Sequence, residues 1–547
     1  MKWPYAAVGA PAAAQISLVK LLDASSRAAA AEGQPATFHI TGLPAGATWD
    51  PDAKRLTFTP DFIQGGLSHR ITAVLDDADQ PPQHLDVTVQ DTITPPLPRI
   101  INTEDMGTYE RLTIEQTTDA FLDSPGHAGR TFEAIITVPK GTSAQNQRPV
   151  RVTFHGFFGS PWREGWEGEF RIAAHDPSNT YWWGYNDQLP GEPPNTGTTP
   201  PYTQRRVLNL LGWVLKQYPG ADQNRIYAEG ASMGGTGAAA FGLLHCRHVA
   251  WISATIFQPI ARNHRPSRVG QLSGLWGSPE QNFDDGTGMG VWDRLDLTDT
   301  LATSPCARDR FIFLKHGKDD PIIHFGAVTQ PSPRTSDTFY QALQKHHVGH
   351  LAIWDEGGHG VPDPLLGDAW WDTGWNPIFD GVTWLRRDHS FPAFSQSSVD
   401  DDPGDDQGNG RVPWDPESGF SASLTTPGDT GWSGDIAGAL GRSLRWDSAG
   451  IIDTPQRWSV PIKALNADGG PAPQPGYPTT GDRLDGTPPI TVDVTPRRLQ
   501  AFRPTPGTTI QWTYAAQSGQ TTVAADGTFT IPTLQLSSVW QTLECHR

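Results

Sequence analysis

The sequence predicts a central α/β domain, with a mostly parallel sheet and helices on both faces, flanked by N- and C-terminal β-sandwich modules. Its 547 residues exceed what one hydrophobic core accommodates, so several domains are expected. Its 57 Gly and 49 Pro indicate many turns and a strong β component. Strand-like and helix-like segments alternate only within residues 99–395, and such alternation is typical of a parallel sheet covered by helices.

Residues 1–98 are expected to form the N-terminal module. Short apolar runs there alternate with turn-forming Gly and Pro, as in Gly42–Pro51, and this spacing is typical of small antiparallel sheets. The stretch resembles the Ig-like or cadherin-like modules of secreted multidomain proteins. The strand-like runs are Leu56–Thr59, Ile71–Leu75 and Leu85–Val89, and a proline-rich linker is expected at Asp91–Arg99.

Residues 99–395 are expected to form the central α/β domain. The first expected helix carries Val207, Leu210, Leu211 and Val214 at helical spacing, so these side chains are predicted to be core. Strands are expected at Phe132–Val138, Val150–Phe154, Arg225–Ala228, Val249–Ile256, Arg310–Lys315 and Leu351–Trp354, and helices at Tyr202–Tyr218, Gly235–Leu244, Asp337–His346 and Pro377–Arg386.

An acidic, Gly-rich linker is expected at 396–436, followed by a C-terminal β-sandwich of fibronectin or Ig type at 437–547. The linker contains Asp400–Asp406, and a solvated segment is the favoured interpretation. A calcium-binding loop is the alternative, but the ligand spacing matches no known loop. Strands of the C-terminal module are expected at Ser443–Trp446, Trp458–Ile462, Ile490–Val494, Ile510–Tyr514 and Thr528–Ile531.

The net charge of −18 argues against a nucleic-acid partner or an anionic membrane surface, because both require a basic footprint. No run approaches the length of a membrane-spanning helix, so membrane insertion is not expected. The apolar stretch after Met1 is too short for a signal peptide. A secreted protein whose signal is absent from this sequence is the favoured interpretation, because the flanking modules look extracellular; a cytoplasmic protein is the alternative.

The three cysteines form neither a disulfide framework nor a metal motif. Cys246 and Cys306 each precede a predicted strand, so both lie at the same edge of the sheet if those strands are parallel neighbours. A disulfide between them and two buried free thiols are both open at this point. Cys545 is expected to be free.

The motif Gly230-Ala231-Ser232-Met233-Gly234 has the form G-x-S-x-G and lies between a predicted strand and a predicted helix. A serine on a tight strand-to-helix turn needs Gly neighbours, and the helix N-terminus directs its N–H groups toward the hydroxyl. These are the requirements of an acyl-transfer nucleophile. Ser232 is therefore the predicted nucleophile, and the N–H of Met233 the first predicted oxyanion donor.

A serine hydroxyl needs a histidine base that a carboxylate orients. The strand expected at Arg310–Lys315 leads into His316-Gly317-Lys318-Asp319-Asp320, where Asp320 is the preferred acid and Asp319 the alternative. The strand expected at Leu351–Trp354 leads into a Gly-rich loop that contains His359, the predicted base. Asp355 and Glu356 are further alternatives for the acid. His316, His324, His346, His347 and His350 are less favoured as bases, because none follows a strand in a Gly-rich loop.

The loop His155-Gly156-Phe157-Phe158-Gly159 follows the strand expected at Val150–Phe154. It resembles the H-G-x-x-G oxyanion loop of esterases, and that resemblance makes the N–H of Phe157 the second oxyanion donor. An ordinary strand-to-helix turn is the alternative interpretation.

Together these motifs resemble the α/β-hydrolase superfamily, and within it the polyhydroxybutyrate depolymerases and the feruloyl and acetylxylan esterases of the carbohydrate esterase family 1 type. The resemblance covers about residues 100–390. Ser160–Pro201 and the segment between the Val249 and Arg310 strands depart from the family pattern. Both are rich in aromatic residues, which are expected to stack on rings of a substrate. Trp182, Trp183 and His155 are the predicted substrate-binding residues.

The resemblance implies a secreted serine esterase that hydrolyses carboxylic esters of a polymeric or carbohydrate-linked substrate, such as acetyl or feruloyl esters or a polyester, through an acyl-enzyme. The reaction requires no metal and no organic cofactor. The expected partner is this ester substrate, and the oligomeric state is left open. A prolyl-oligopeptidase-like serine peptidase is one alternative function. A non-catalytic carbohydrate-binding or adhesion protein with a degenerate hydrolase domain is the other.

Overall fold

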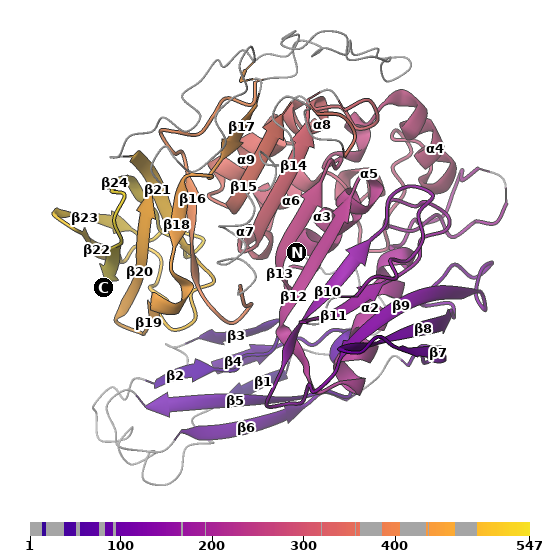
Figure 1. Ribbon diagram of the computed structural model, residues 1–547, viewed down its shortest axis with the longest axis horizontal. Helices are drawn as coiled ribbons and strands as arrows, with labels where there is room; N and C mark the ends of the chain where they lie inside the picture. The colour runs from indigo at the N-terminus through magenta and orange to yellow at the C-terminus, as the bar shows by residue number, and fades with distance from the viewer. Residues whose placement is uncertain are drawn as a thin grey trace.

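A ten-stranded mixed sheet forms the centre of the computed structural model, in the order β17-β15-β14-β13-β12-β10-β11-β9-β8-β7 (Figure 1). The structure describes residues 14–17, 38–50, 55–75, 82–90, 94–165, 168–191, 193–318, 320–355, 357–360, 385–404, 434–435, 437–464 and 490–547. Within them, no helix is both long and apolar enough to cross a membrane.

Six neighbouring strands of this sheet are parallel, so their carboxyl ends meet at one edge. They are β10 (Arg148–Phe154), β11 (Phe170–Ala173), β12 (Ala221–Ala231), β13 (Val249–Thr255), β14 (Phe311–Gly317) and β15 (Gly349–Asp355). The antiparallel strands are β7 (Arg99–Asp105), β8 (Tyr109–Thr117), β9 (Thr131–Pro139) and β17 (Gly438–Leu440). The strands predicted in this domain are all present, whereas β7, β8 and β11 were not predicted.

Three helices agree with the sequence prediction. They are α2 (Tyr202–Gln217), α3 (Met233–Leu244) and α9 (Phe339–Lys345). The predicted helix Pro377–Arg386 lies outside the described residues except for its last two, which are not helical. Five further helices were not predicted; they are α4 (Pro266–Trp276), α5 (Val291–Arg294), α6 (Leu297–Thr303), α7 (Pro305–Arg308) and α8 (Gly326–Thr329).

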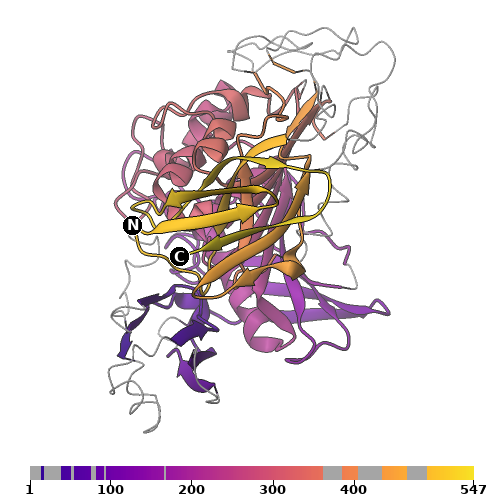
Figure 2. The ribbon, with the colours of Figure 1, turned by 90° about the vertical axis from the view of Figure 1, so that its left-hand side faces the viewer.

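The two faces of the parallel strands pack against different layers. Side chains alternate between faces along a strand, and in β14 Ile312 and Leu314 join one hydrophobic core with helices α2, α3, α6 and α9. Phe311 and Phe313 join a second core, which contains the strands of the C-terminal module. The prediction of helices on both faces therefore differs from the described structure, where a β-sheet module covers the second face (Figures 1 and 2).

The C-terminal module consists of two antiparallel sheets that share this second core. The first sheet contains β16 (Phe391–Ser395), β21 (Ile490–Arg497) and β24 (Ile531–Leu536). The second contains β18 (Leu444–Trp446), β19 (Ile452–Asp453), β20 (Arg457–Ala464), β22 (Thr509–Tyr514), β23 (Gln517–Thr522) and β25 (Gln541–His546). The predicted strand Thr528–Ile531 is displaced, because β24 begins at Ile531.

Strand pairing crosses the domain boundaries that the sequence predicts. β16 lies within residues 99–395 but pairs with β21 of the C-terminal module. β17 lies within residues 437–547 but pairs with β15 of the central sheet. The two parts are therefore joined through paired strands as well as through a shared core.

The N-terminal module forms two three-stranded sheets below the central sheet (Figure 1). One contains β1 (Ala14–Ser17), β3 (Ala47–Asp50) and β4 (Arg55–Phe58), and the other β2 (Phe38–Thr41), β5 (Ser68–Leu75) and β6 (Gln83–Thr88). A short 3₁₀ turn, η2 (Phe62–Gln64), packs against α2, and Ile63 belongs to the helix-side core. This turn joins the module to the helix layer of the central sheet.

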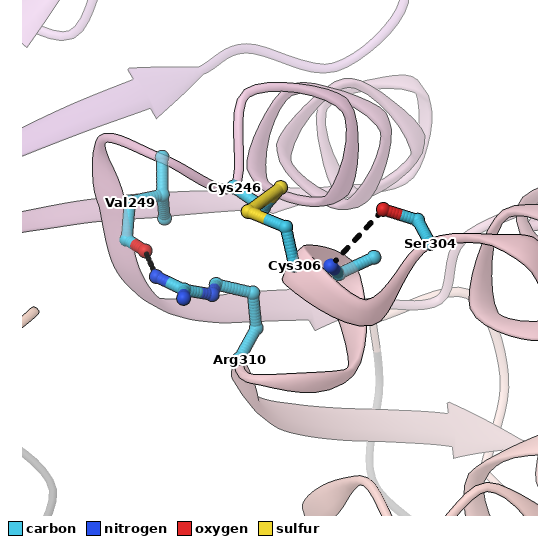
Figure 3. The surroundings of a disulfide bond; sticks show 6 residues. Cys246, Val249, Ser304, Cys306 and Arg310 are labelled. Atoms are coloured by element: carbon cyan, nitrogen blue, oxygen red, sulfur yellow. Dashed lines mark hydrogen bonds between the residues drawn. A yellow bond between two sulfur atoms is a disulfide. The ribbon is translucent and has the colours of Figure 1, made fainter. Parts of the chain in front are cut away.

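Cys246 and Cys306 form a disulfide that encloses a loop of 60 residues (Figure 3). Their Cα atoms are 5.8 Å apart, because α3 and α7 end beside each other just before the neighbouring strands β13 and β14. Of the two possibilities that the sequence left open, a disulfide and two free thiols, the structure therefore has the disulfide. Cys545 is free and buried, and burial raises the pKa of its thiol.

Replacing both Cys246 and Cys306 by Ala is expected to lower the free energy of unfolding by about 2–4 kcal/mol, because the disulfide restricts a long loop in the unfolded chain. Denaturant unfolding with and without reductant measures this. Reductant should destabilise the wild type and leave the double variant unchanged. Equal stability of both proteins under oxidising conditions would contradict the bond.

Candidate active site

Ser232 occupies a strained turn between β12 and α3. Its φ of 61° and ψ of −128° lie in a region that side chains rarely adopt. Such a conformation costs about 1–3 kcal/mol and persists only where the surroundings enforce it. Here the Ser232 N–H donates to the Thr255 carbonyl at 3.0 Å, and the Ser232 carbonyl accepts from Thr236 N–H at 3.0 Å. The turn thus holds the serine at the carboxyl edge of the sheet.

The glycines of the motif allow backbone to approach backbone. A Cβ atom on Gly234 would overlap the Phe154 carbonyl at the end of β10, and one on Gly230 would overlap the Gly234 carbonyl. Helix α3 therefore begins in direct contact with the two strands on which the site is built. This contact explains why the motif needs small residues at these positions.

A chain of hydrogen bonds joins Ser232, His359 and Asp320. His359 Nε2 lies 2.9 Å from Ser232 Oγ, and His359 Nδ1 lies 2.8 Å and 2.9 Å from the two carboxylate oxygens of Asp320. With Nδ1–H donating to the carboxylate, Nε2 is left as the acceptor for the serine hydroxyl. The structure therefore brings together the three residues that the sequence proposed as nucleophile, base and acid.

The loops after β14 and β15 place the acid and the base. A Cβ atom on Gly317, at the end of β14, would overlap the Gly357 carbonyl, so the two loops lie against each other. The side chain of Asp320 is fully buried and also accepts from the N–H groups of Ile322 at 2.7 Å and Ile323 at 3.0 Å. These donors fix the orientation of the carboxylate.

The described alternative candidates for the acid and the base have other contacts. Asp355 Oδ1 accepts from Gly357 N–H at 2.7 Å, while Asp319 and Glu356 lie outside the described residues. The nearby histidines bond elsewhere: His316 to the Ile323 carbonyl, His324 to Gly326 N–H, His347 to Ser395 and His350 to the Val348 carbonyl.

His155 holds the loop that faces Ser232. Its Nδ1–H donates to the Gly156 carbonyl at 2.8 Å, and its Nε2 accepts from Asp176 N–H at 3.0 Å. Burial lowers the pKa of this imidazole, which agrees with the neutral tautomer that these bonds require. His155 was predicted to bind substrate; instead it is buried, with both ring nitrogens engaged in positioning the loop.

The loop brings a second set of N–H groups to the serine. A Cβ atom on Gly156 would lie 3.9 Å from Ser232 Cβ, so its backbone passes beside the hydroxyl. Within the described residues, neither the Phe157 N–H nor the Met233 N–H has a hydrogen-bond acceptor. These are the two donors that the sequence proposed for an oxyanion.

Trp182 and Trp183 do not line a cleft, contrary to the sequence prediction. Both side chains are fully buried. The Trp182 indole donates to the His155 carbonyl at 3.1 Å, and the Trp183 indole donates to the Thr199 carbonyl at 2.9 Å. Their large apolar area lies inside the helix-side core, where it supports the loop from behind.

Sequence reasoning missed three residues that shape the site. Buried Asp176 accepts from Thr180 and from Trp182 N–H, which closes the turn behind His155. Asn179 Oδ1 accepts from Phe158 N–H at 2.7 Å. Phe158 itself has a φ of 57° and an exposed fraction of 82%. Spacing alone gave no signal for these roles, because each depends on contacts between loops.

No family model and no curated protein matches this chain. Among solved structures, it is similar to an S-formylglutathione hydrolase from Agrobacterium tumefaciens, with 13% identity over 48% of this chain and 92% of that chain, and a TM-score of 0.35. It is also similar to an acetyl xylan esterase from Paenibacillus sp. R4. The identity is 15% over 52% of this chain and 89% of that chain, and the TM-score is 0.35. A ferulic acid esterase is similar as well, with 15% identity over 51% of this chain and 98% of that chain, and a TM-score of 0.31.

Gly234→Ala is expected to destabilise the protein by about 1–3 kcal/mol, because the new Cβ would overlap the Phe154 carbonyl. Gly270→Ala, in α4, is the matched control: a Cβ there meets nothing within 4 Å, so about 0.5–1 kcal/mol of stabilisation is expected. Thermal unfolding measures both. Equal shifts in the same direction would contradict the close packing at the motif.

Proposed function

We propose that this protein is a serine hydrolase of carboxylic esters with an α/β-hydrolase catalytic domain. The observation that carries the proposal is the continuous chain from Ser232 Oγ through His359 to Asp320. This geometry is that of an activated serine nucleophile, and the chain order Ser, Asp, His is the order found in α/β-hydrolases.

The reaction proceeds in two steps. Ser232 Oγ attacks the ester carbonyl while His359 Nε2 takes its proton, and the N–H groups of Met233 and Phe157 stabilise the negative oxygen. His359 then gives the proton to the leaving alcohol, which departs as the acyl-enzyme forms. A water molecule, deprotonated by His359, attacks the carbonyl of the acyl-enzyme. His359 then returns this proton to Ser232 Oγ as the bond between Oγ and the acyl carbon breaks and the acid leaves. Asp320 stays ionised and stabilises the imidazolium in both steps.

We further propose that the substrate is a polymeric or carbohydrate-linked ester with an apolar or aromatic group, and that the protein is secreted. Phe158 supports an apolar or aromatic group on the substrate, because it lies on the loop beside Ser232 and its ring is exposed. An exposed ring on a strained backbone contributes little to folding, so a role in binding would account for it. The disulfide supports secretion, because such bonds persist mainly in oxidising compartments. The proposed modules at 1–98 and 437–547 would then serve as β-sandwich partners of the catalytic domain.

Ser232→Ala is expected to reduce the hydrolysis of 4-nitrophenyl acetate by at least about 10³-fold, and His359→Ala by a similar factor. His346→Ala is the matched control and should retain full activity, because His346 does not contact Ser232 or Asp320. Equal rates for Ser232→Ala and the wild type would contradict the proposal. Serine-dependent cleavage of peptide anilides without ester hydrolysis would instead indicate a peptidase.

Phe158→Asn tests the role of the exposed ring. Asn adopts positive φ more readily than Phe, so the stability should stay equal or rise by up to about 1 kcal/mol. The kcat/KM for 4-nitrophenyl benzoate should fall by about tenfold through KM, while 4-nitrophenyl acetate is hydrolysed as before. Val539→Asn, at an exposed site of the C-terminal module, is the control. Unchanged selectivity in Phe158→Asn would remove this residue from the substrate site.

A further inference from the structure

Helix α4 lies in the long segment between β13 and β14, and one of its arginines contacts the loop beside Ser232. The guanidinium carbon of Arg268 lies 3.8 Å from the centre of the Phe157 ring. Phe157 supplies one of the two N–H groups proposed for the oxyanion, but that mechanism gives no role to its ring or to Arg268. The contact therefore joins a helix of this segment to a donor of the candidate site.

Arg268 occupies a position that is unfavourable for a cation. Its side chain is only 6% exposed, and burial lowers the pKa of the guanidinium. It lies in the first turn of α4, where the helix dipole disfavours a positive charge. Within the described residues no carboxylate pairs with it, and its Nε–H is buried without an acceptor. Each of these features costs free energy, so the contacts that Arg268 does make have to offset them.

The contacts of the guanidinium come from two aromatic rings and one amide. The Phe157 ring lies within the distance at which a cation is attracted to an aromatic face, and the centre of the Tyr181 ring is farther away, at 5.8 Å. Gln271 Oε1, one turn along α4, accepts from Arg268 Nη1 at 2.5 Å. Gln271 thus fixes the guanidinium from within its own helix, and the closest ring that it attracts is that of Phe157.

His264, two residues before α4, anchors the start of this helix. Its Nδ1 accepts from Arg265 N–H at 2.8 Å, so its Nε2–H donates to the Tyr181 hydroxyl at 2.9 Å. Both side chains are buried, and burial lowers the pKa of His264, which agrees with the neutral imidazole that these bonds require. Tyr181 belongs to the helix-side core. Arg268 therefore extends from a helix start that is held to the core.

The ring of Phe157 is held on more than one side. It packs against the helix-side core, and the Phe158 ring meets it edge to face with 4.3 Å between the ring centres. His155 and Trp182 bind the start of the loop, whereas no described acceptor holds the Phe157 N–H itself. Because the ring and the N–H belong to one residue, a fixed ring restricts the backbone rotation that directs this N–H.

We propose that Arg268 is a positioning residue for ester hydrolysis, because its guanidinium holds the Phe157 ring and thereby directs the Phe157 N–H toward the oxyanion. This inference rests on the proposed function, since it concerns a donor of the same site. An oxyanion donor is effective only when it points at the oxygen that becomes negative, and a small misplacement removes much of its effect. Arg268 acts through Phe157 and does not itself need to touch the reacting atoms.

Arg268→Met keeps the length of the side chain and removes its charge. The kcat/KM for 4-nitrophenyl acetate is expected to fall by about tenfold through kcat, with KM changed by less than about twofold, because the donor acts in the transition state. Inhibition by phenylboronic acid, which forms a tetrahedral adduct on a nucleophilic serine, should weaken by a similar factor. Arg268→Lys keeps a cation over the ring and should restore kcat to within about threefold of the wild type.

A double-mutant cycle tests whether Arg268 acts through the ring. Phe157→Leu keeps the N–H and removes the aromatic face, so adding Arg268→Met to it should change kcat/KM by less than about twofold. Arg262→Met is the matched control and should keep full activity, because Arg262 precedes α4 and pairs with Asp293 at 2.8 Å. Thermal midpoints report whether each variant is folded. Arg268→Gln, a second neutral variant, carries the test if Arg268→Met does not fold.

Full activity of the folded neutral variants would overturn the proposal, as would a loss in KM alone or an equal loss in Arg268→Lys. The same loss with and without the Phe157 ring would also overturn it, because Arg268 would then act by another route. A wild-type protein that neither hydrolyses the ester nor binds the boronic acid would instead contradict the proposed function. The two failures are therefore distinguishable.

Discussion

The site depends on one steric constraint, the contact between the first turn of α3 and the end of β10. Only a residue without a Cβ fits where Gly234 meets the Phe154 carbonyl. That contact places Ser232 beside the loop that follows β10, so the N–H groups of Met233 and Phe157 come from two elements held together by backbone packing. His155 and Asp176 then fix the loop, while β14 and β15 bring Asp320 and His359 to the same edge.

The C-terminal module is part of the packing of the central sheet. Phe311, Phe313 and Trp251 point away from the helices and are buried in a core that they share with this module. Strand exchange through β16 and β17 strengthens the connection. The module therefore provides the second layer that an apolar parallel sheet requires, and the orientation of β15, which carries the loop of His359, depends on it.

Local patterns predicted the three residues that meet at the candidate site, because each follows a strand in a glycine-containing turn, a property that neighbouring residues determine. The same reasoning failed for Trp182 and Trp183, since whether an aromatic side chain faces a cleft or a core depends on distant elements. It also failed for the second face of the sheet, because a strand buried on both sides has the same sequence pattern under a helix or under another sheet. The edge strand β7 was missed because its mostly exposed positions carry many polar side chains, a pattern that resembles a linker.

The central claim is that Ser232 carries the acyl group between the two steps. The most direct measurement is mass spectrometry of the protein after rapid mixing with 4-nitrophenyl acetate and an acid quench, followed by peptide mapping. The account predicts one acetyl group per chain on the peptide that contains Ser232, formed during the burst of nitrophenol release and lost as turnover ends. Ester hydrolysis without this adduct, or with the acetyl group on another residue, would contradict it.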